Sequence, residues 1–204
     1  MPKVWLRTDE RADILASLCM ISSSCEAAIT DLSAWKWIVI GTHSALQGVM
    51  TLHLGLGNNF LVARPKNTAA WLKAHKDGTP YPELMMDNFL SLYKKLKKHD
   101  ICGYRFKPNG TQGRSIRKIN DFRNEFIHFI PKGWSIEISG MPAICLDCLE
   151  VVANVGKHSL HKRWESEEQQ QSFEKALSQC QSKLSAFHIK YATPLPVSTR
   201  KTKK

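Results

Sequence analysis

Apolar side chains recur every three or four residues over most of the chain, which is the period of a helix with one buried face. The first such stretch has Ile14 and Leu18 on its inner side, and Thr8 before two acidic residues predicts where it starts. Asp31 can cap a second helix over 32–54, which is apolar nearly all round. A helix of that kind lies in the middle of a bundle.

The middle of the chain predicts two more helices. A loop with a short helix around 69–76 follows the second helix. Pro80 and Pro82 then favour the start of a third long helix over 83–99, because proline suits the first turn of a helix. Lysines crowd the end of this segment, where the helix dipole favours positive charge.

The remaining segments follow a turn-rich loop. Ser115 predicts the start of a fourth helix, and Pro131 must stop it because proline lacks an N–H and clashes with the carbonyl four residues back. Residues 134–138 alternate between polar and apolar, which indicates a short strand or extended segment. Further helices are expected over 142–156 and 164–190.

Together these segments predict an all-α protein, an up-and-down bundle of about five to six helices with a short extended segment after the fourth. A chain of 204 residues, 43% apolar and 23% charged, suits one folded domain, which we place at 1–192. Residues 193–204 contain two prolines and four basic side chains. They predict a flexible basic tail.

The expected compartment is the cytoplasm. Residues 1–11 show no secretory signal, because charges return before an apolar stretch can form. Six scattered cysteines favour reduced thiols over a disulfide framework. Residues 37–63 lack Lys, Arg, Asp and Glu, but eight polar side chains interrupt them. We therefore expect a buried central helix and no membrane span.

Positive charge is concentrated in one part of the chain. The chain has 29 Lys and Arg against 18 Asp and Glu, a formal net charge of +11. Residues 94–132 contain eleven of these basic side chains and three of the acidic ones, and so carry +8 alone. A solvated face that keeps the protein soluble is the alternative, but the bias shared by a lysine run, a loop and a helix favours RNA binding. The candidate nucleic-acid-binding residues are Arg114, Arg117, Lys118 and Lys132.

One run within this basic segment follows a known pattern. Arg123 is followed directly by Asn124 and, after four intervening residues, by His128. On a late helix of a small bundle, this arrangement resembles the signature of the HEPN superfamily, whose name refers to higher-eukaryote and prokaryote nucleotide binding. Segments 35–37 and 43–48, and the Phe-x-Pro-Lys-Gly-Trp run after the histidine, also resemble uncharacterised bacterial HEPN-like proteins.

The resemblance spans roughly residues 8–160 and implies a metal-independent endoribonuclease of toxin–antitoxin, phage-defence or RNA-processing systems. It implies that Arg123 holds the scissile phosphate, that His128 acts as general acid or base, and that Asn124 orients the pair. Arginine offers a bidentate fork to phosphate and histidine exchanges protons near pH 7, so the side-chain chemistry agrees. The expected product is a 2′,3′-cyclic phosphate, with no cofactor. The expected partners are RNA and, in some of these systems, an antitoxin or other partner protein.

Helical spacing constrains how this pair could work. Five positions along an ideal helix leave Arg123 and His128 about 140° apart around the axis. Either Pro131 loosens the last turn, or two chains pool their side chains in one cleft, and the resemblance favours the second arrangement. We therefore expect a homodimer whose seam is closed by phenylalanines, namely Phe106, Phe122, Phe126 and Phe129.

Other interpretations of these residues stay open. Arg123 and His128 could be a structural pair at a helix end, in a non-catalytic helical module that binds RNA or a protein partner. His43 and Gln47, four positions apart, could line the same cleft, although a satisfied core pair is favoured. Some HEPN members are inactivated at a tyrosine two residues after the histidine. This chain has Ile130 there, so we do not expect that control.

A second motif suggests zinc. Cys145, Cys148, His158 and His161 follow the general order of the ligands in a zinc finger. Both intervals are shorter than the usual finger spacing, and the two cysteines lie among apolar residues. We therefore favour a buried helix face and predict no metal site.

Overall fold

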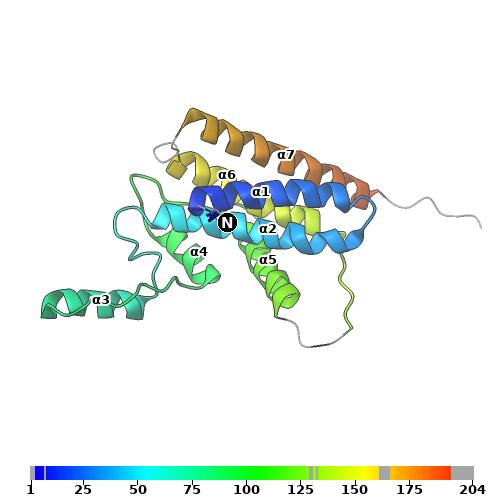
Figure 1. Cartoon of the computed structure of the whole chain (residues 1–204). Coiled ribbons are helices and arrows are strands. Elements are labelled where there is room, and N and C mark those ends of the chain that lie inside the picture. Colours follow the sequence, from blue (N-terminus) through cyan, green and yellow to red (C-terminus); the bar gives the residue numbers. More distant parts are fainter. Residues whose placement is uncertain (1–2, 7, 129–130, 132, 161–165, 194–204) are drawn as a thin grey trace, which may run out of the picture.

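The computed structural model describes residues 3–6, 8–128, 131, 133–160 and 166–193. These residues form seven α-helices and one short 3₁₀-helix, with no β-strand among them, so the predicted all-α class is confirmed. The helices, shown in Figure 1, are α1 (Glu10–Ala27), η1 (Leu32–Ala34), α2 (Trp35–Leu54), α3 (Pro65–Asp77), α4 (Phe89–Lys98), α5 (Gln112–Ile127), α6 (Met141–Leu160) and α7 (Glu167–Ala192).

Helix α2 is the centre of the bundle. It packs against α1, α4, α5 and α6, and fourteen of its 20 residues are buried, as its nearly continuous apolar surface predicted. Glycine lets α1 approach closely: a Cβ atom at Gly48 would lie 2.6 Å from Cγ1 of Ile14, and one at Gly41 would lie 2.8 Å from Cγ1 of Ile21. Helix α7 packs on α1 and α6, which completes the body shown in Figure 1.

Side-chain caps fix the first helices. The Asp9 carboxylate, rather than the Thr8 hydroxyl expected from the sequence, accepts a hydrogen bond from the Ala12 amide at 2.8 Å and so begins α1. Asp31 accepts from the Ser33 amide at 2.8 Å and begins η1, so the α-helix predicted from residue 32 begins three residues later, at Trp35.

The predicted third helix begins six residues later than expected. Residues 83–88 are not helical, because the Arg64 amide donates to the Met85 carbonyl and the Asp87 amide donates to the Val62 carbonyl, each at 2.9 Å. Helix α4 starts only where the Asn88 side chain accepts from the Ser91 amide at 2.9 Å. Pro80 and Pro82 therefore precede an extended segment, which corrects the helix expected over 83–99.

The ends of the later helices also differ from the prediction. Helix α5 begins three residues before Ser115 and ends at Ile127, ahead of the expected stop at Pro131. Residues 134–138 form neither a helix nor a strand. Helix α6 extends beyond 156, and the Ser166 hydroxyl caps α7 by accepting from the Gln169 amide at 3.2 Å.

Helix α3 stands apart from the bundle in Figure 1. It begins with proline in its first turn and is longer than the short helix expected over 69–76. It packs against no other helix of the described chain. Its place outside the body is a feature that hydrophobic periodicity did not indicate.

The structure also bears on the cysteine thiols and on the question of a membrane-spanning helix. All six cysteines are free thiols, which agrees with the expected lack of a disulfide framework. Within the described residues, no helix is long and apolar enough to cross a membrane. Most of the predicted tail, residues 194–204, lies outside the described residues.

Candidate functional site

Helix α5, which carries most of the predicted site, is fastened to α6 at its start. The Asp147 carboxylate on α6 accepts hydrogen bonds from the Thr111 hydroxyl at 2.7 Å and the Ser115 hydroxyl at 2.5 Å. Beside them, Nε2 of Gln112 donates to Oε2 of Glu150 at 2.7 Å. These bonds fix the start of α5, because hydrogen bonds to carboxylates are stronger than those between neutral groups.

Three predicted RNA-binding residues share the outer side of α5. Arg114, Arg117 and Lys118 are exposed, whereas Ile116 and Ile119 on the inner side are completely buried. The helical repeat of 100° per residue produces this division into a charged side and a core side. The charged side is therefore held in a fixed orientation by the packing of the opposite side.

Neighbouring segments add further cations. Lys94 and Lys98 at the end of α4 are exposed, and so are Arg105 and Lys107 in the following loop. Lys95 differs, because its ammonium group lies 2.8 Å from the Asp87 carboxylate and donates to the Ala63 carbonyl at 2.8 Å.

The cations of residues 94–132 are therefore of two kinds, those that hold the fold together and those that are exposed to solvent. Lys95 is structural, since both of its partners hold the segment before α4 in place. Lys132 lies outside the described residues. The exposed cations of α4, the loop and α5 form the candidate nucleic-acid interface.

Arg123 lies on the side of α5 that faces α2. Its Nη1 donates to Oδ1 of Asn124 at 3.1 Å, and its charge acts on His43 of α2. The His43 ring is 5% exposed and stacks on Phe89 with centroids 4.0 Å apart. Burial and the Arg123 charge lower the pKa of His43 to about 4, against the opposing effect of a hydrogen bond with Asn120. His43 is therefore neutral at pH 7 and does not repel Arg123.

His128 ends α5 and is exposed. Its backbone has left the helical conformation (φ −120°, ψ 32°), while its N–H still donates to the Asn124 carbonyl at 2.8 Å. In the part of the chain that the structure describes, no hydrogen bond joins Arg123 to His128. Asn124 bonds to both residues, through its side-chain oxygen to Arg123 and through its backbone carbonyl to the His128 amide.

Asn120 was not recognised as a residue near the site, and His43 was named only together with Gln47, as a core pair or as part of the cleft. The Arg123 charge acts on His43, and His43 shares a hydrogen bond with Asn120, which lies 77 positions away in the sequence. The predicted pairing of His43 with Gln47 is wrong: Nε2 of Gln47 lies 3.9 Å from the sulfur of Met86 instead. The signal for His43 in the sequence was its spacing of four from Gln47 on a helix that is apolar nearly all round.

The expected phenylalanine seam is corrected at one position. Phe106 is 2% exposed and packs in the core of its own chain, near Tyr93, so it is not available to a partner. Phe122 and Phe126 are partly buried against the same core. Phe129 lies outside the described residues. The homodimer itself stays a prediction.

The cysteines of the zinc-like motif are core residues. Cys145 and Cys148 are completely buried, and burial raises the pKa of the Cys145 thiol to about 12. The His158 ring stacks on Tyr104 with centroids 3.9 Å apart, and His161 lies outside the described residues. Among the described side chains, no three His, Cys, Asp or Glu groups lie close enough to hold a metal ion.

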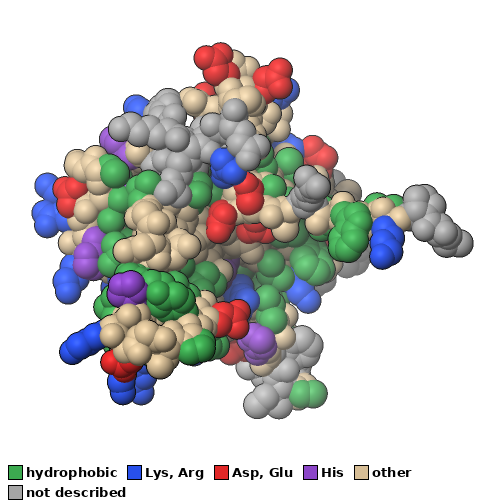
Figure 2. All heavy atoms as spheres, turned by 60° about the vertical axis from the view of Figure 1, so that its left-hand side comes forward, with side chains coloured by type: hydrophobic (Ala, Val, Ile, Leu, Met, Phe, Trp, Pro, Cys, Tyr) green, Lys and Arg blue, Asp and Glu red, His purple; other side chains and the backbone are tan. Residues whose placement is uncertain are grey.

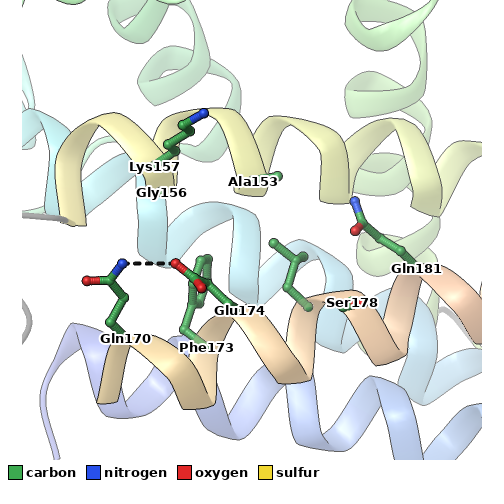
Figure 3. Close-up of a pocket in the computed structure, with 9 residues that line it drawn as sticks. Ala153, Gly156, Lys157, Gln170, Phe173, Glu174, Ser178 and Gln181 are labelled. Carbon is green, nitrogen blue, oxygen red and sulfur yellow. Dashed lines mark hydrogen bonds between the residues drawn. The ribbon is translucent and has the colours of Figure 1, made fainter. Parts of the chain in front are cut away.

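Two cavities lie away from α5. One of about 250 Å³ lies between α6 and α7, where Ala153 and Phe173 line it and Gln170 donates to Glu174 at 2.9 Å (Figure 3). The other, of about 690 Å³, lies beside the start of α1. None of the exposed cations of α5, nor Arg123 or His128, lines either cavity, whereas Gln47 lines the second.

Comparisons with known proteins identify no relative. No protein-family model, no curated protein and no solved structure matches the chain.

Proposed function

We propose that this protein is a metal-independent endoribonuclease of the HEPN type that acts on RNA bound along the outer side of α5. The observation that carries the proposal is the line of exposed cations at Arg114, Arg117 and Lys118, which leads along one anchored helix to Arg123 and the exposed His128. Cations along a rigid helix attract a phosphate backbone. The acid–base group at the end of the same helix supplies what transesterification of RNA requires.

The proposed reaction uses only protein side chains. His128 accepts the proton of the RNA 2′-hydroxyl, the 2′-oxygen forms a bond to the adjacent phosphorus, and the bond from phosphorus to the 5′-oxygen breaks. The leaving 5′-oxygen takes a proton from water, and His128 then releases its proton to the solvent. The products are a 2′,3′-cyclic phosphate and a free 5′-hydroxyl. Arg123 stabilises the negative charge on the phosphate with its guanidinium fork.

Two chains are needed for this reaction in our proposal. Arg123 is half-buried toward α2, whereas His128 is exposed at the helix end, and no hydrogen bond links the two described side chains within one copy. In a twofold dimer the arginine of one copy can face the histidine of the other. The neutral His43 is compatible with this role, because it places no second positive charge that would repel the Arg123 guanidinium.

The test is RNA cleavage in EDTA by the wild type and by two variants. We expect the wild type to cleave, and Arg123→Ala and His128→Ala each to lower the rate by at least about 100-fold, the usual effect of acid–base or charge-stabilising groups. Lys175→Ala and His188→Ala are matched controls, because both residues are exposed on α7. Equal rates for all five proteins, or no cleavage by the wild type, would contradict the proposal.

A non-catalytic RNA-binding module is the second candidate. The missing link between Arg123 and His128 within one copy favours it, because a binding surface needs no such link. This candidate predicts RNA binding that weakens steeply with salt and no cleavage under any condition.

A further inference from the structure

An arm, defined here as residues 60–86, projects from the bundle and contains α3. Helix α3 packs against no other helix of the described chain, and Figure 1 shows it at some distance from the body. The base of the arm is held by backbone pairing, in which Ala63 and Met86 form an antiparallel bridge and the Arg64 amide donates to the Met85 carbonyl at 2.9 Å. The arm is therefore a defined element that the fold of the bundle does not require.

Nearly parallel rings form the outer part of this arm. The Tyr81 ring stacks on Trp71 with centroids 4.4 Å apart and an interplanar angle of 10°. Nδ1 of His75 lies 3.0 Å from the Tyr81 hydroxyl, and Phe60 packs edge-on against Trp71 at 5.0 Å. Tyr81 is nevertheless 55% exposed. One side of its ring is held by Trp71, and much of the rest of the side chain is open to solvent.

The arm is also basic. Its four Lys and Arg residues are all exposed, and its two acidic residues leave a net charge of +2; the basic residues are Arg64, Lys66, Lys73 and Lys76. Charges on so narrow an element act together, because the Debye length at physiological salt is about 8 Å. Figure 2, which turns this side of the molecule forward, shows hydrophobic, His and basic side chains close together at its lower left.

We propose that the arm is a stacking platform for single-stranded RNA. A base laid on the open face of Tyr81 extends the Trp71–Tyr81 stack, and the arm's cations attract the phosphates on either side of it. Single strands are selected because the bases of a duplex already stack on one another. The inference goes beyond the proposed function, since this binding requires no cleavage.

A protein partner is the competing occupant, because Leu72 and Met85 on the arm are about half exposed. Two observations favour nucleic acid. The rings form a parallel stack with an open end, which matches the flat face of a base, and the cations outnumber the carboxylates. In the view of Figure 1, α3, α4 and α5 also lie on the side of α2 away from α7. A single RNA strand bound on α5 would therefore lie on the same side of the molecule as the arm.

The experiment measures binding of a fluorescent 12-nucleotide 2′-O-methyl RNA by anisotropy. This probe lacks the attacking hydroxyl and cannot be cleaved. We expect Tyr81→Ala and Tyr81→Leu to raise the Kd for the single strand about tenfold, as loss of one stacking contact does. Tyr81→Phe keeps the ring and Leu72→Ala is the matched apolar control, so both should stay within about twofold of the wild type. Binding of the same sequence as a duplex should not change in any of the four.

Two variants at Tyr81 guard against a folding artefact. Leucine keeps an apolar contact with Trp71 but offers no ring, and the bundle's melting temperature should be the same in both variants because α3 packs on no other helix. An unchanged Kd in Tyr81→Leu overturns the inference. So does a loss in Leu72→Ala equal to that in Tyr81→Leu, since that result indicates a general apolar surface suited to a protein.

Failure of this inference and failure of the proposed function give different results. Arg117→Gln on α5 should weaken single-strand and duplex binding alike, whatever the arm does. Wild-type binding that depends on Tyr81 without any RNA cleavage would remove the nuclease and keep the arm. Cleavage that depends on His128, with RNA binding indifferent to Tyr81, would remove the arm and keep the nuclease.

Discussion

Helices α5 and α3 are both exposed and both basic, yet they are built in opposite ways. Helix α5 buries Ile116 and Ile119, and its start is bonded to α6. Helix α3 buries only Ala74, and its Trp71 ring stacks on Tyr81 of the same arm. The orientation of α5 is therefore fixed by its packing and by its bonds to α6, whereas α3 has no support from any other helix of the described chain.

The largest expected difference between the two helices is in global stability. Ile116→Ala removes a completely buried side chain and should lower the free energy of unfolding by about 3–4 kcal/mol. Trp71→Ala in the arm should change it by less than about 0.5 kcal/mol, because the arm adds little to the bundle core. Urea unfolding followed by circular dichroism measures both. A comparable loss in the two variants would show that the arm is part of the cooperative core.

The second difference is pH dependence. Since the pKa of His43 falls from 6.5 in the unfolded chain to about 4 in the fold, the unfolded state binds the extra proton between these values. The contribution of neutral His43 to stability is fully present above pH 6.5. The free energy of unfolding should decline by about 3 kcal/mol as the pH falls to 4. His43→Phe keeps a ring against Phe89 and should flatten this part of the profile. His75→Phe in the arm should leave it unchanged, and a profile unaffected by His43→Phe would contradict the assigned pKa.

Next in size is the polar fastening of α5. Asp147→Asn weakens the bonds to Thr111 and Ser115 and should lower the free energy of unfolding by about 1–2 kcal/mol. Asp77→Asn, at the exposed end of α3, is the matched control and should have no measurable effect. Thermal unfolding of both variants provides the measurement, and equal melting temperatures would show that the fastening is not needed.

The smallest effect concerns glycine substitution on the two exposed surfaces. Lys118→Gly in α5 should lower global stability by roughly 0.5–1 kcal/mol, because glycine is a poor helix former. Ala70→Gly in α3 should leave the melting temperature unchanged and lower only the opening free energy of the α3 amides, by about 1 kcal/mol. Native-state hydrogen exchange separates the two outcomes. Faster exchange of bundle amides in Ala70→Gly would indicate that arm and bundle open together.

The same contrast explains what the sequence could predict. The central helix and the Asp31 cap follow from local patterns, and both agree with the structure. The extended segment before α4 does not, because it is set by bonds from 85–87 to residues 62–64, more than twenty positions away. Hydrophobic periodicity also gives no sign that α3 leaves the bundle.

The site was predictable to a similar extent. Exposure of Arg114, Arg117 and Lys118 follows from the helical repeat around the buried isoleucines. The approach of His43 to Arg123 does not, because it depends on how α2 and α5 pack. Burial of Phe106 likewise depends on the tertiary fold, which is why its place in a dimer seam was wrong.

Subunit mixing tests the central claim most directly. Arg123→Ala and His128→Ala chains, each inactive alone, are mixed, allowed to exchange subunits and assayed for RNA cleavage in EDTA. If one chain's arginine works with the other's histidine, a mixed twofold dimer keeps one intact site, and the mixture should recover about a quarter of wild-type activity. No recovery, with exchange verified by mass-tagged subunits and a wild-type protein that cleaves, would contradict the shared site.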